Sequence, residues 1–151
     1  MTDIKVTGRK FLGVDHGDKR IGLALSDDTL RFARPLRIIE HVSREDDAKR
    51  VIDIAHIEAC TDILVGVPYD SDGNVGPRAR KVLRFVEMLK SLTTLQVDVW
   101  DESGSTMAFK NLSLQMGQSA KQRRKPSDDR VAALILQDYL DNHYLAKDKN
   151  D

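Results

Sequence analysis

Hydrophobic and polar residues alternate with a period of two near the start of the chain, which predicts β-strands. Residues 10–16 and 20–26 form two short candidate strands joined by the tight turn 17–19. Residues 31–39 form a third, and Pro35 would confine it to a sheet edge or a bulge because proline has no N–H to donate. The chain therefore opens with adjacent antiparallel strands.

From Ser43 the apolar residues follow the helical period of 3.6 instead. Ser43 and Asp46 resemble an N-cap and its first-turn acid, and the residues that follow supply a broad apolar face. Three further helices are expected at 78–91, less regularly through Met107, Leu112 and Leu114, and at 128–144.

Two short apolar runs between the helices are typical of buried parallel strands. They cover residues 62–67 and 95–100, and polar loops are expected at 69–77 and 117–127. The order of elements is three strands, then alternating helices and strands, then two helices. Because a fully parallel sheet would not begin with a three-residue turn, the pattern predicts a mixed sheet with helices on its faces.

Composition indicates one globular domain and argues against a strongly basic protein, a disulfide-bonded protein and a membrane protein. The chain has 151 residues, of which 40% are hydrophobic and 32% charged. Lys and Arg (24) balance Asp and Glu (24), so any electropositive surface must be local. A single cysteine, Cys60, excludes an intrachain disulfide and is expected in the core. With no membrane-length apolar run and no signal-peptide core, we expect a cytoplasmic domain over 1–151 with a frayed tail at 146–151.

Acidic residues stand where several predicted elements end. Asp15 closes the first strand, Asp101 and Glu102 follow the 95–100 strand, and Asp128 and Asp129 begin the last helix. Strand ends and helix starts meet along one rim of an open sheet, where ligands commonly bind. Carboxylates gathered there would repel one another unless cations lay between them, and Mg²⁺ or Mn²⁺ prefers such oxygen ligands.

Each acid also has an ordinary structural explanation. Asp15 before His16 and Gly17 can be a turn former. Asp101 and Glu102 can cap the next helix, and the same holds for an acid at 128–129. Three acidic positions at element ends therefore do not by themselves establish a nuclease.

Four blocks, in order and in spacing, resemble the YqgF family, also called the RuvX or Holliday junction resolvase family. The first is FLGVDHGDKRIGLALSD at 11–27, and the last is DDRVAALILQDYL at 128–140. Between them, ILVGVPYDSDGNVG at 63–76 is similar to the family's strand and glycine loop, and VDVWDESGST at 97–106 to its Asp-Glu-Arg-x-(Ser/Thr)-Thr segment. The resemblance covers residues 10–142.

The resemblance implies an α/β, RNase H-like fold: a mixed five-stranded sheet with helices on both faces. It also implies that Asp15, Glu102 and Asp128 are catalytic and bind Mg²⁺ or Mn²⁺. Such ions can activate a water for in-line attack on phosphorus, leaving a 5′ phosphate. Beside the motif, Gly13 and Gly17 are expected to leave room for a phosphate backbone to approach.

The resemblance does not fully decide the third acid or the residue that follows Glu102. Asp128 is preferred over Asp129 because it stands nine residues before Gln137, the family's spacing, whereas helix geometry does not decide between the two acids. The family's Arg after Asp-Glu is Ser103 here. An arginine can clamp a phosphate with two hydrogen bonds and a serine cannot, so either another cation takes this role or the substrate binds more weakly.

Cations near the acidic positions are the candidate nucleic-acid contacts. They lie in the first turn, after the glycine loop and just before the last helix: Lys19, Arg20, Arg78, Arg80, Lys121, Arg123, Arg124 and Lys125. Taken alone, the run at 121–125 is more often a solvated loop. His16 is more often structural than a ligand, and Trp100 is expected to pack in the core rather than stack on a base.

The leading hypothesis is a metal-dependent nuclease acting on structured RNA, with maturation of the 5′ end of 16S ribosomal RNA as the family-level expectation. One alternative is resolution of branched, four-way DNA junctions, which needs paired cuts and a dimer. Another is a non-catalytic ribosome-assembly factor that binds nucleic acid. A sugar-kinase-like phosphotransferase ranks last because 151 residues leave no second lobe. Expected partners are nucleic acid and a ribosome precursor, without a membrane, for a monomer or homodimer.

Overall fold

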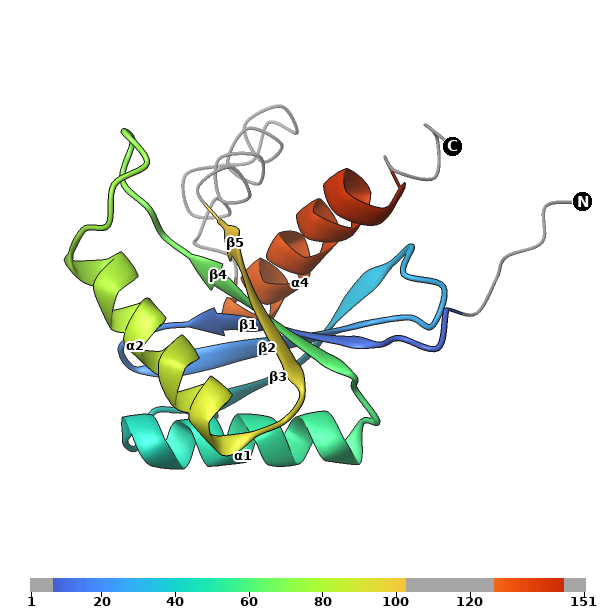
Figure 1. Ribbon diagram of the computed structural model, residues 1–151, viewed down its shortest axis with the longest axis horizontal. Coiled ribbons are helices and arrows are strands. Elements are labelled where there is room, and N and C mark those ends of the chain that lie inside the picture. Colours follow the sequence, from blue (N-terminus) through green and yellow to red (C-terminus); the bar gives the residue numbers. More distant parts are fainter. Residues whose placement is uncertain (1–6, 103–126, 146–151) are drawn as a thin grey trace, which may run out of the picture.

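A five-stranded mixed sheet forms the centre of the protein (Figure 1) in the computed structural model, which describes residues 7–102 and 127–145. The strands are β1 (Phe11–His16), β2 (Arg20–Ser26), β3 (Ala33–Glu40), β4 (Asp62–Val67) and β5 (Gln96–Asp101). Their order across the sheet is β3-β2-β1-β4-β5. The pairs β1–β2 and β2–β3 are antiparallel, and β1–β4 and β4–β5 are parallel. The predicted α/β fold with a mixed sheet is confirmed.

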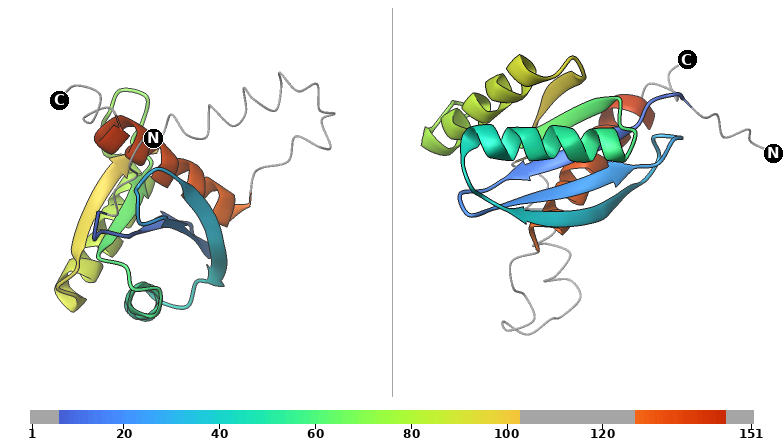
Figure 2. Two further views of the ribbon diagram at one scale, coloured as in Figure 1. Left: turned by 90° about the vertical axis from the view of Figure 1, so that its right-hand side faces the viewer. Right: turned by 90° about the horizontal axis from the view of Figure 1, so that it is seen from below.

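Helices cover both faces of the sheet (Figure 2). On one face lie α1 (Arg44–Ile57) and α2 (Pro77–Leu92), and on the other lies α4 (Asp128–Tyr139), which continues into the π-helical segment η1 (Leu140–Leu145). The single helix predicted over 128–144 therefore changes its hydrogen-bond period at Leu140. The helix predicted through Met107, and most of the 117–127 loop, fall outside the described residues. None of the described helices has the length and apolar character needed to span a membrane.

The alternation of side chains along the strands builds two hydrophobic cores. On β1, Leu12 and Val14 pack with α1 and α2, whereas Phe11 packs with α4. Trp100 lies against the α4 core and donates from its indole nitrogen to Asp138 at 2.7 Å, which confirms its predicted packing role. Cys60 is buried, as expected. The first four residues of β1 are therefore buried, with helices packed on both faces of the strand just before Asp15.

Strand β3 is an edge strand with a bulge, as Pro35 predicts. Ala24 of β2 pairs with Pro35, and Leu23 pairs with Arg37, so one extra residue stands on β3 between these two pairs. Both features tolerate a residue without an N–H donor.

Close contact between α4 and β2 places the first turn of α4 over the sheet. A Cβ atom on Gly22 would lie 1.9 Å from the carbonyl oxygen of Asp128, a distance that no side chain can occupy. Gly22 pairs directly with Asp15 across β1 and β2. Glycine at this position therefore allows the start of α4 to lie beside Asp15.

We predict that Gly22→Ser lowers the free energy of unfolding by about 3 kcal/mol or more, because overpacking against backbone cannot be relieved by rotating a side chain. Urea denaturation followed by circular dichroism measures this. Gly76→Ser is the matched control, since a Cβ on Gly76 meets no atom within 4 Å. Equal stability of the two variants would contradict the assigned packing.

Candidate active site

Three acidic side chains converge at the rim where β1, β4 and β5 end. Asp15 shares a strand face with Phe11, so its side chain lies on the α4 side of the sheet. Glu102 directly follows β5, and its N–H donates to the carbonyl of Val67 at 3.2 Å, which ties it to the end of β4. Asp128 begins α4. The fold therefore places Asp15 and Glu102 in contact, with Asp128 near enough for its charge to act on Asp15.

Asp15, which is partly exposed, and the buried Glu102 form a carboxyl pair. Burial is the main cause that raises the pKa of Asp15 to about 8, and the charges of Glu102 and Asp128 raise it further. Burial also raises the pKa of Glu102, which shares a side-chain hydrogen bond with Asp15. At neutral pH and without a cation, Asp15 is the protonated partner and donates to Glu102. The pair is therefore poised to exchange a proton for a positive ion.

The second carboxyl oxygen of Glu102 has no hydrogen-bond partner among the described residues. Glu102 is only 8% exposed, and its Oε2 atom is buried without a donor. A Cβ on Gly66 would lie 3.0 Å from this oxygen and 2.7 Å from Ile135 Cδ1, so glycine keeps the space next to it open. A buried carboxylate oxygen left unsatisfied is costly, and a cation is a natural partner for it.

Asp128 stands slightly apart from this pair. Its Oδ2 atom accepts from Arg20 Nε at 3.3 Å. The neighbouring Asp129 instead accepts a hydrogen bond from the N–H of Arg130 at 3.0 Å, and its charge is not among the causes of the Asp15 shift. As the side chains are placed, no three His, Cys, Asp or Glu groups in the described residues are close enough to ligate one ion. Asp128 would have to leave Arg20 to join the other two acids.

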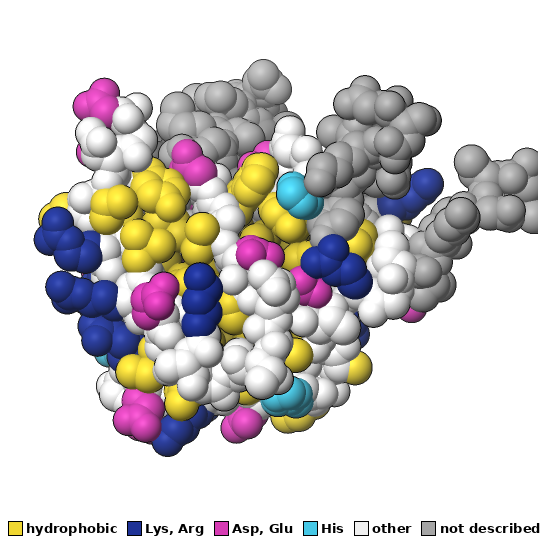
Figure 3. Space-filling view, viewed as in Figure 1, with side chains coloured by type: hydrophobic (Ala, Val, Ile, Leu, Met, Phe, Trp, Pro, Cys, Tyr) yellow, Lys and Arg dark blue, Asp and Glu magenta, His cyan; other side chains and the backbone are white. Residues whose placement is uncertain are grey.

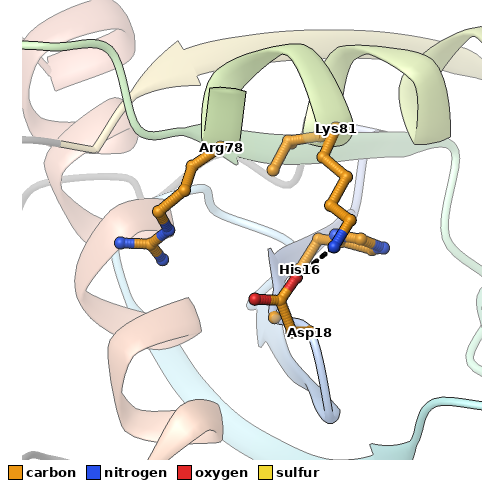
Figure 4. A pocket seen from close by; sticks show the side chains of 6 residues that line it. His16, Asp18, Arg78 and Lys81 are labelled. Carbon is orange, nitrogen blue, oxygen red and sulfur yellow. Dashed lines mark hydrogen bonds and ion pairs between the residues drawn. The ribbon is translucent and has the colours of Figure 1, made fainter. Parts of the chain in front are cut away.

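Arg78 is the cation whose charge reaches the carboxyl pair. It lowers the pKa of both Asp15 and Glu102 against the larger effect of burial. Figure 4 shows Arg78 and Lys81 extending from α2 on the side where Asp18 and His16 lie. Lys81 Nζ binds Asp18 Oδ1 at 2.8 Å, and this contact lowers the pKa of Asp18.

Of the other predicted nucleic-acid contacts, two lie in the described part of the chain. Lys19 and Arg80 are exposed and form no ion pair with the acids in the described part of the chain. Lys and Arg side chains gather on the left of Figure 3, the side where α2 lies. Four exposed basic residues belong to α2: Arg78, Arg80, Lys81 and Arg84. The predicted contacts at 121–125, and Ser103, lie outside the described residues.

The structure shows what two of the predicted glycines do in the fold. A Cβ on Gly13 would lie 3.0 Å from Leu136 Cβ, so this glycine admits α4. A Cβ on Gly17 would lie 2.6 Å from the carbonyl of Arg20, so this glycine closes the β1–β2 turn. At both positions the protein itself occupies the place of a Cβ, so helix packing and turn closure explain these glycines, and the approach of a phosphate backbone stays a prediction.

Three contributors to the site were missed in the sequence. Gly22 and Gly66 make room for Asp128 and Glu102, and Lys81 binds the turn beside Asp15. Gly22 could have been found from the predicted hairpin, because the short turn between the two strands places Gly22 opposite Asp15. Nothing in the local pattern pointed to Gly66 or Lys81.

Comparison with known proteins decides the family. The sequence model of RuvX, described as Holliday junction resolvase, matches residues 9–142. The chain belongs to the RuvX family. A relative from Desulforamulus reducens, named "Putative pre-16S rRNA nuclease", is 39% identical over 88% of this chain and 97% of its own. One of the same name from Symbiobacterium thermophilum is 41% identical over 85% and 90%. The predicted class, a nuclease that hydrolyses phosphodiester bonds, is confirmed.

Solved structures confirm the RNase H-like fold of this RuvX-family protein. RuvC of T. thermophilus in complex with a Holliday junction substrate superposes with a TM-score of 0.55 at 16% identity, covering 87% of this chain and 93% of RuvC. The resolvase of Fowlpox virus in complex with Holliday junction DNA gives 0.54 at 12% identity, covering 89% and 99%. At these identities the likeness concerns the fold alone.

We predict that, without divalent cations, the stability of the protein falls as the pH rises from about 5 to 8. The folded state keeps a proton on Asp15 up to a pKa of about 8, whereas the unfolded state releases it near pH 4. The free energy of unfolding should then fall by up to about 1.4 kcal/mol per pH unit in this window. Urea denaturation in a chelator across the pH range measures it.

Asp15→Asn should flatten this pH dependence and be more stable than the wild type at pH values above 8, because it has no proton to lose. Asp53→Asn, which changes an exposed acid on α1, is the control and should retain the wild-type slope. A wild type whose stability rises with pH over this window would contradict the assigned burial.

Proposed function

We propose that this protein is a divalent-metal-dependent nuclease that cleaves the precursor of 16S ribosomal RNA in the cytoplasm. Asp15, Glu102 and Asp128 are the proposed catalytic and metal-binding residues. The observation that carries the proposal is the carboxyl pair of Asp15 and Glu102, in which one carboxyl is held protonated and one carboxylate oxygen has no partner among the described residues. The names of the relatives support the choice of substrate.

The donor set fits a hard divalent cation. All three side chains offer carboxylate oxygens, the ligands that Mg²⁺ and Mn²⁺ prefer, and no thiol or imidazole joins them in the described residues. Mg²⁺ or Mn²⁺ supplies Lewis acidity, which activates water for attack on phosphorus and offsets charge on the leaving oxygen. Asp15, Glu102 and Asp128 would hold the ion; Asp15 would then be deprotonated, and the Oε2 atom of Glu102 would have a partner. Asp128, which contacts Arg20, would complete the set.

The basic residues around this rim would hold the RNA. Arg20 and Arg78 lie next to the acids, and Lys19 and Arg80 extend the positive surface on either side. Lys121, Arg123, Arg124 and Lys125 remain proposed contacts from the sequence. Because the protein has no net charge, this local surface is what would attract a polyanion.

A second candidate function is cleavage of four-way DNA junctions, which the description of the matching family favours. Paired symmetric cuts need two active sites, so this function requires a homodimer, whereas RNA processing can be carried out by a monomer. The same acids would serve both reactions, and the substrate distinguishes them.

We predict that the wild-type protein cleaves a 16S precursor RNA with Mg²⁺ or Mn²⁺, leaving a 5′ phosphate, and that Asp15→Asn loses about a thousandfold or more of this rate. The amide has the shape of the carboxyl but cannot provide a negative oxygen. A gel assay would compare the precursor, a four-way DNA junction and single-stranded controls. Asp53→Asn should cleave like the wild type.

Preferred cutting of the DNA junction would select the second candidate function. Binding of the precursor without cutting of any substrate would instead indicate a ribosome-assembly factor without nuclease activity. Cleavage by Asp15→Asn at the wild-type rate would show that the site is wrongly assigned.

We further predict that Mg²⁺ or Mn²⁺ at about one hundred times its dissociation constant raises the melting temperature by about 5 to 10 °C. The ion competes with the proton of Asp15, so at a fixed ion concentration the shift should grow from pH 6 to 8. Differential scanning fluorimetry measures it without substrate. Asp15→Asn and Glu102→Gln should lose most of the shift, and NaCl at equal ionic strength should not reproduce it in the wild type.

A further inference from the structure

A small pocket lies between the end of β1 and the first turns of α2 (Figure 4). Its volume is about 20 Å³, room for about one water molecule. It is lined by the end of β1, the following turn and the first turns of α2: His16, Gly17, Asp18, Arg78, Lys81 and Val82. Of these residues, Arg78 is a proposed RNA contact, and the pocket itself is separate from the three acids.

The position of the pocket relates it to the cleavage site. Asp15 and His16 are consecutive residues of β1, so their side chains lie on opposite faces of the strand. The His16 ring packs on Phe85 of α2, with the ring centroids 4.4 Å apart. A phosphate backbone that crosses the end of β1 would therefore meet the acids on one face and this pocket on the other. Arg78 lines the pocket and its charge acts on Asp15 and Glu102, so one nucleic-acid strand that crosses the end of β1 would contact both places.

The charges at the pocket suit an anion. Lys81 and Asp18 form an ion pair whose side chains are 60% and 68% exposed, and such pairs add little to stability. Arg78 forms no ion pair within the described residues, and its charge acts on Asp15, Glu102 and Asp18 together. Among the described residues that line the pocket, Asp18 is the only carboxylate, and it binds the only lysine, Lys81.

We propose that Lys81 and Arg78 bind the phosphate next to the scissile one, and that Asp18 holds Lys81 in position until this phosphate replaces it. The inference rests on the proposed nuclease function and names a subsite of that function. Lys81 and Arg78 are binding residues here, and Asp18 is a positioning residue that competes with the substrate. Binding then exchanges one weak ion pair for a charge-assisted contact with the RNA.

Opposite effects of two substitutions test this exchange. In an Asp15→Asn background, which prevents cleavage, Lys81→Gln should weaken binding of the structured precursor RNA about tenfold. Asp18→Asn should instead tighten binding, because it removes the competing anion and leaves the cation in place. Fluorescence anisotropy at several salt concentrations gives the dissociation constants, and Lys81→Gln should also lower the salt slope by about one phosphate contact.

The same helix provides a matched control. Lys90 and Glu87 form an exposed ion pair near the other end of α2, with Nζ and Oε1 4.0 Å apart. Lys90→Gln and Glu87→Gln should change the affinity by less than about twofold, because this pair does not line the pocket. If both pairs behave alike, or if Asp18→Asn weakens binding, the Lys81 pair is only a solvated ion pair and the inference is wrong.

An uncharged linkage in the RNA locates the phosphate. Methylphosphonates placed one at a time around the cleavage position should include one, adjacent to it, at which Lys81→Gln no longer weakens binding. An effect of Lys81→Gln that persists at every position would overturn the subsite. A wild type that binds but does not cleave would overturn the proposed function instead, while these binding comparisons would still decide whether the pocket holds a phosphate.

Discussion

The close approach of α4 to the sheet is the constraint on which the site depends. Gly13, Gly22 and Gly66 lie where α4 or its neighbours would collide with any side chain, so the helix packs directly onto the strands. This packing partly buries Asp15 and buries Glu102, and burial is the largest cause of their raised pKa values. Backbone proximity thus turns two ordinary acids into a pair that cannot both be charged without a cation.

The positive charges near the acids do not balance their negative charges. Arg78 and Arg20 each act on the acids from one side, yet neither removes the excess negative charge. A fully paired site would be more stable in the absence of metal and would have less to gain from binding one. Excess negative charge of this kind is what the proposed metal site requires, because a cation would offset it.

Much of the fold could be predicted from the sequence, because period-two and period-3.6 patterns record which faces are buried. The strand over 62–67, the start of α1 after Ser43 and the edge position of Pro35 all followed from such local signals. The three acids required the family motif, since element ends alone allow caps and turns. The roles of Gly66 and Lys81 depend on contacts between distant segments, which no local pattern records.

The bulged edge strand has a consequence for how the molecule behaves at high concentration. Pro35 offers no N–H to an incoming strand, and the bulge breaks the regular ladder beside it. Arg34 and Arg37 are exposed on the same strand and would face like charges on a second copy. Extension of the sheet from one molecule into the next is therefore disfavoured at the β3 edge.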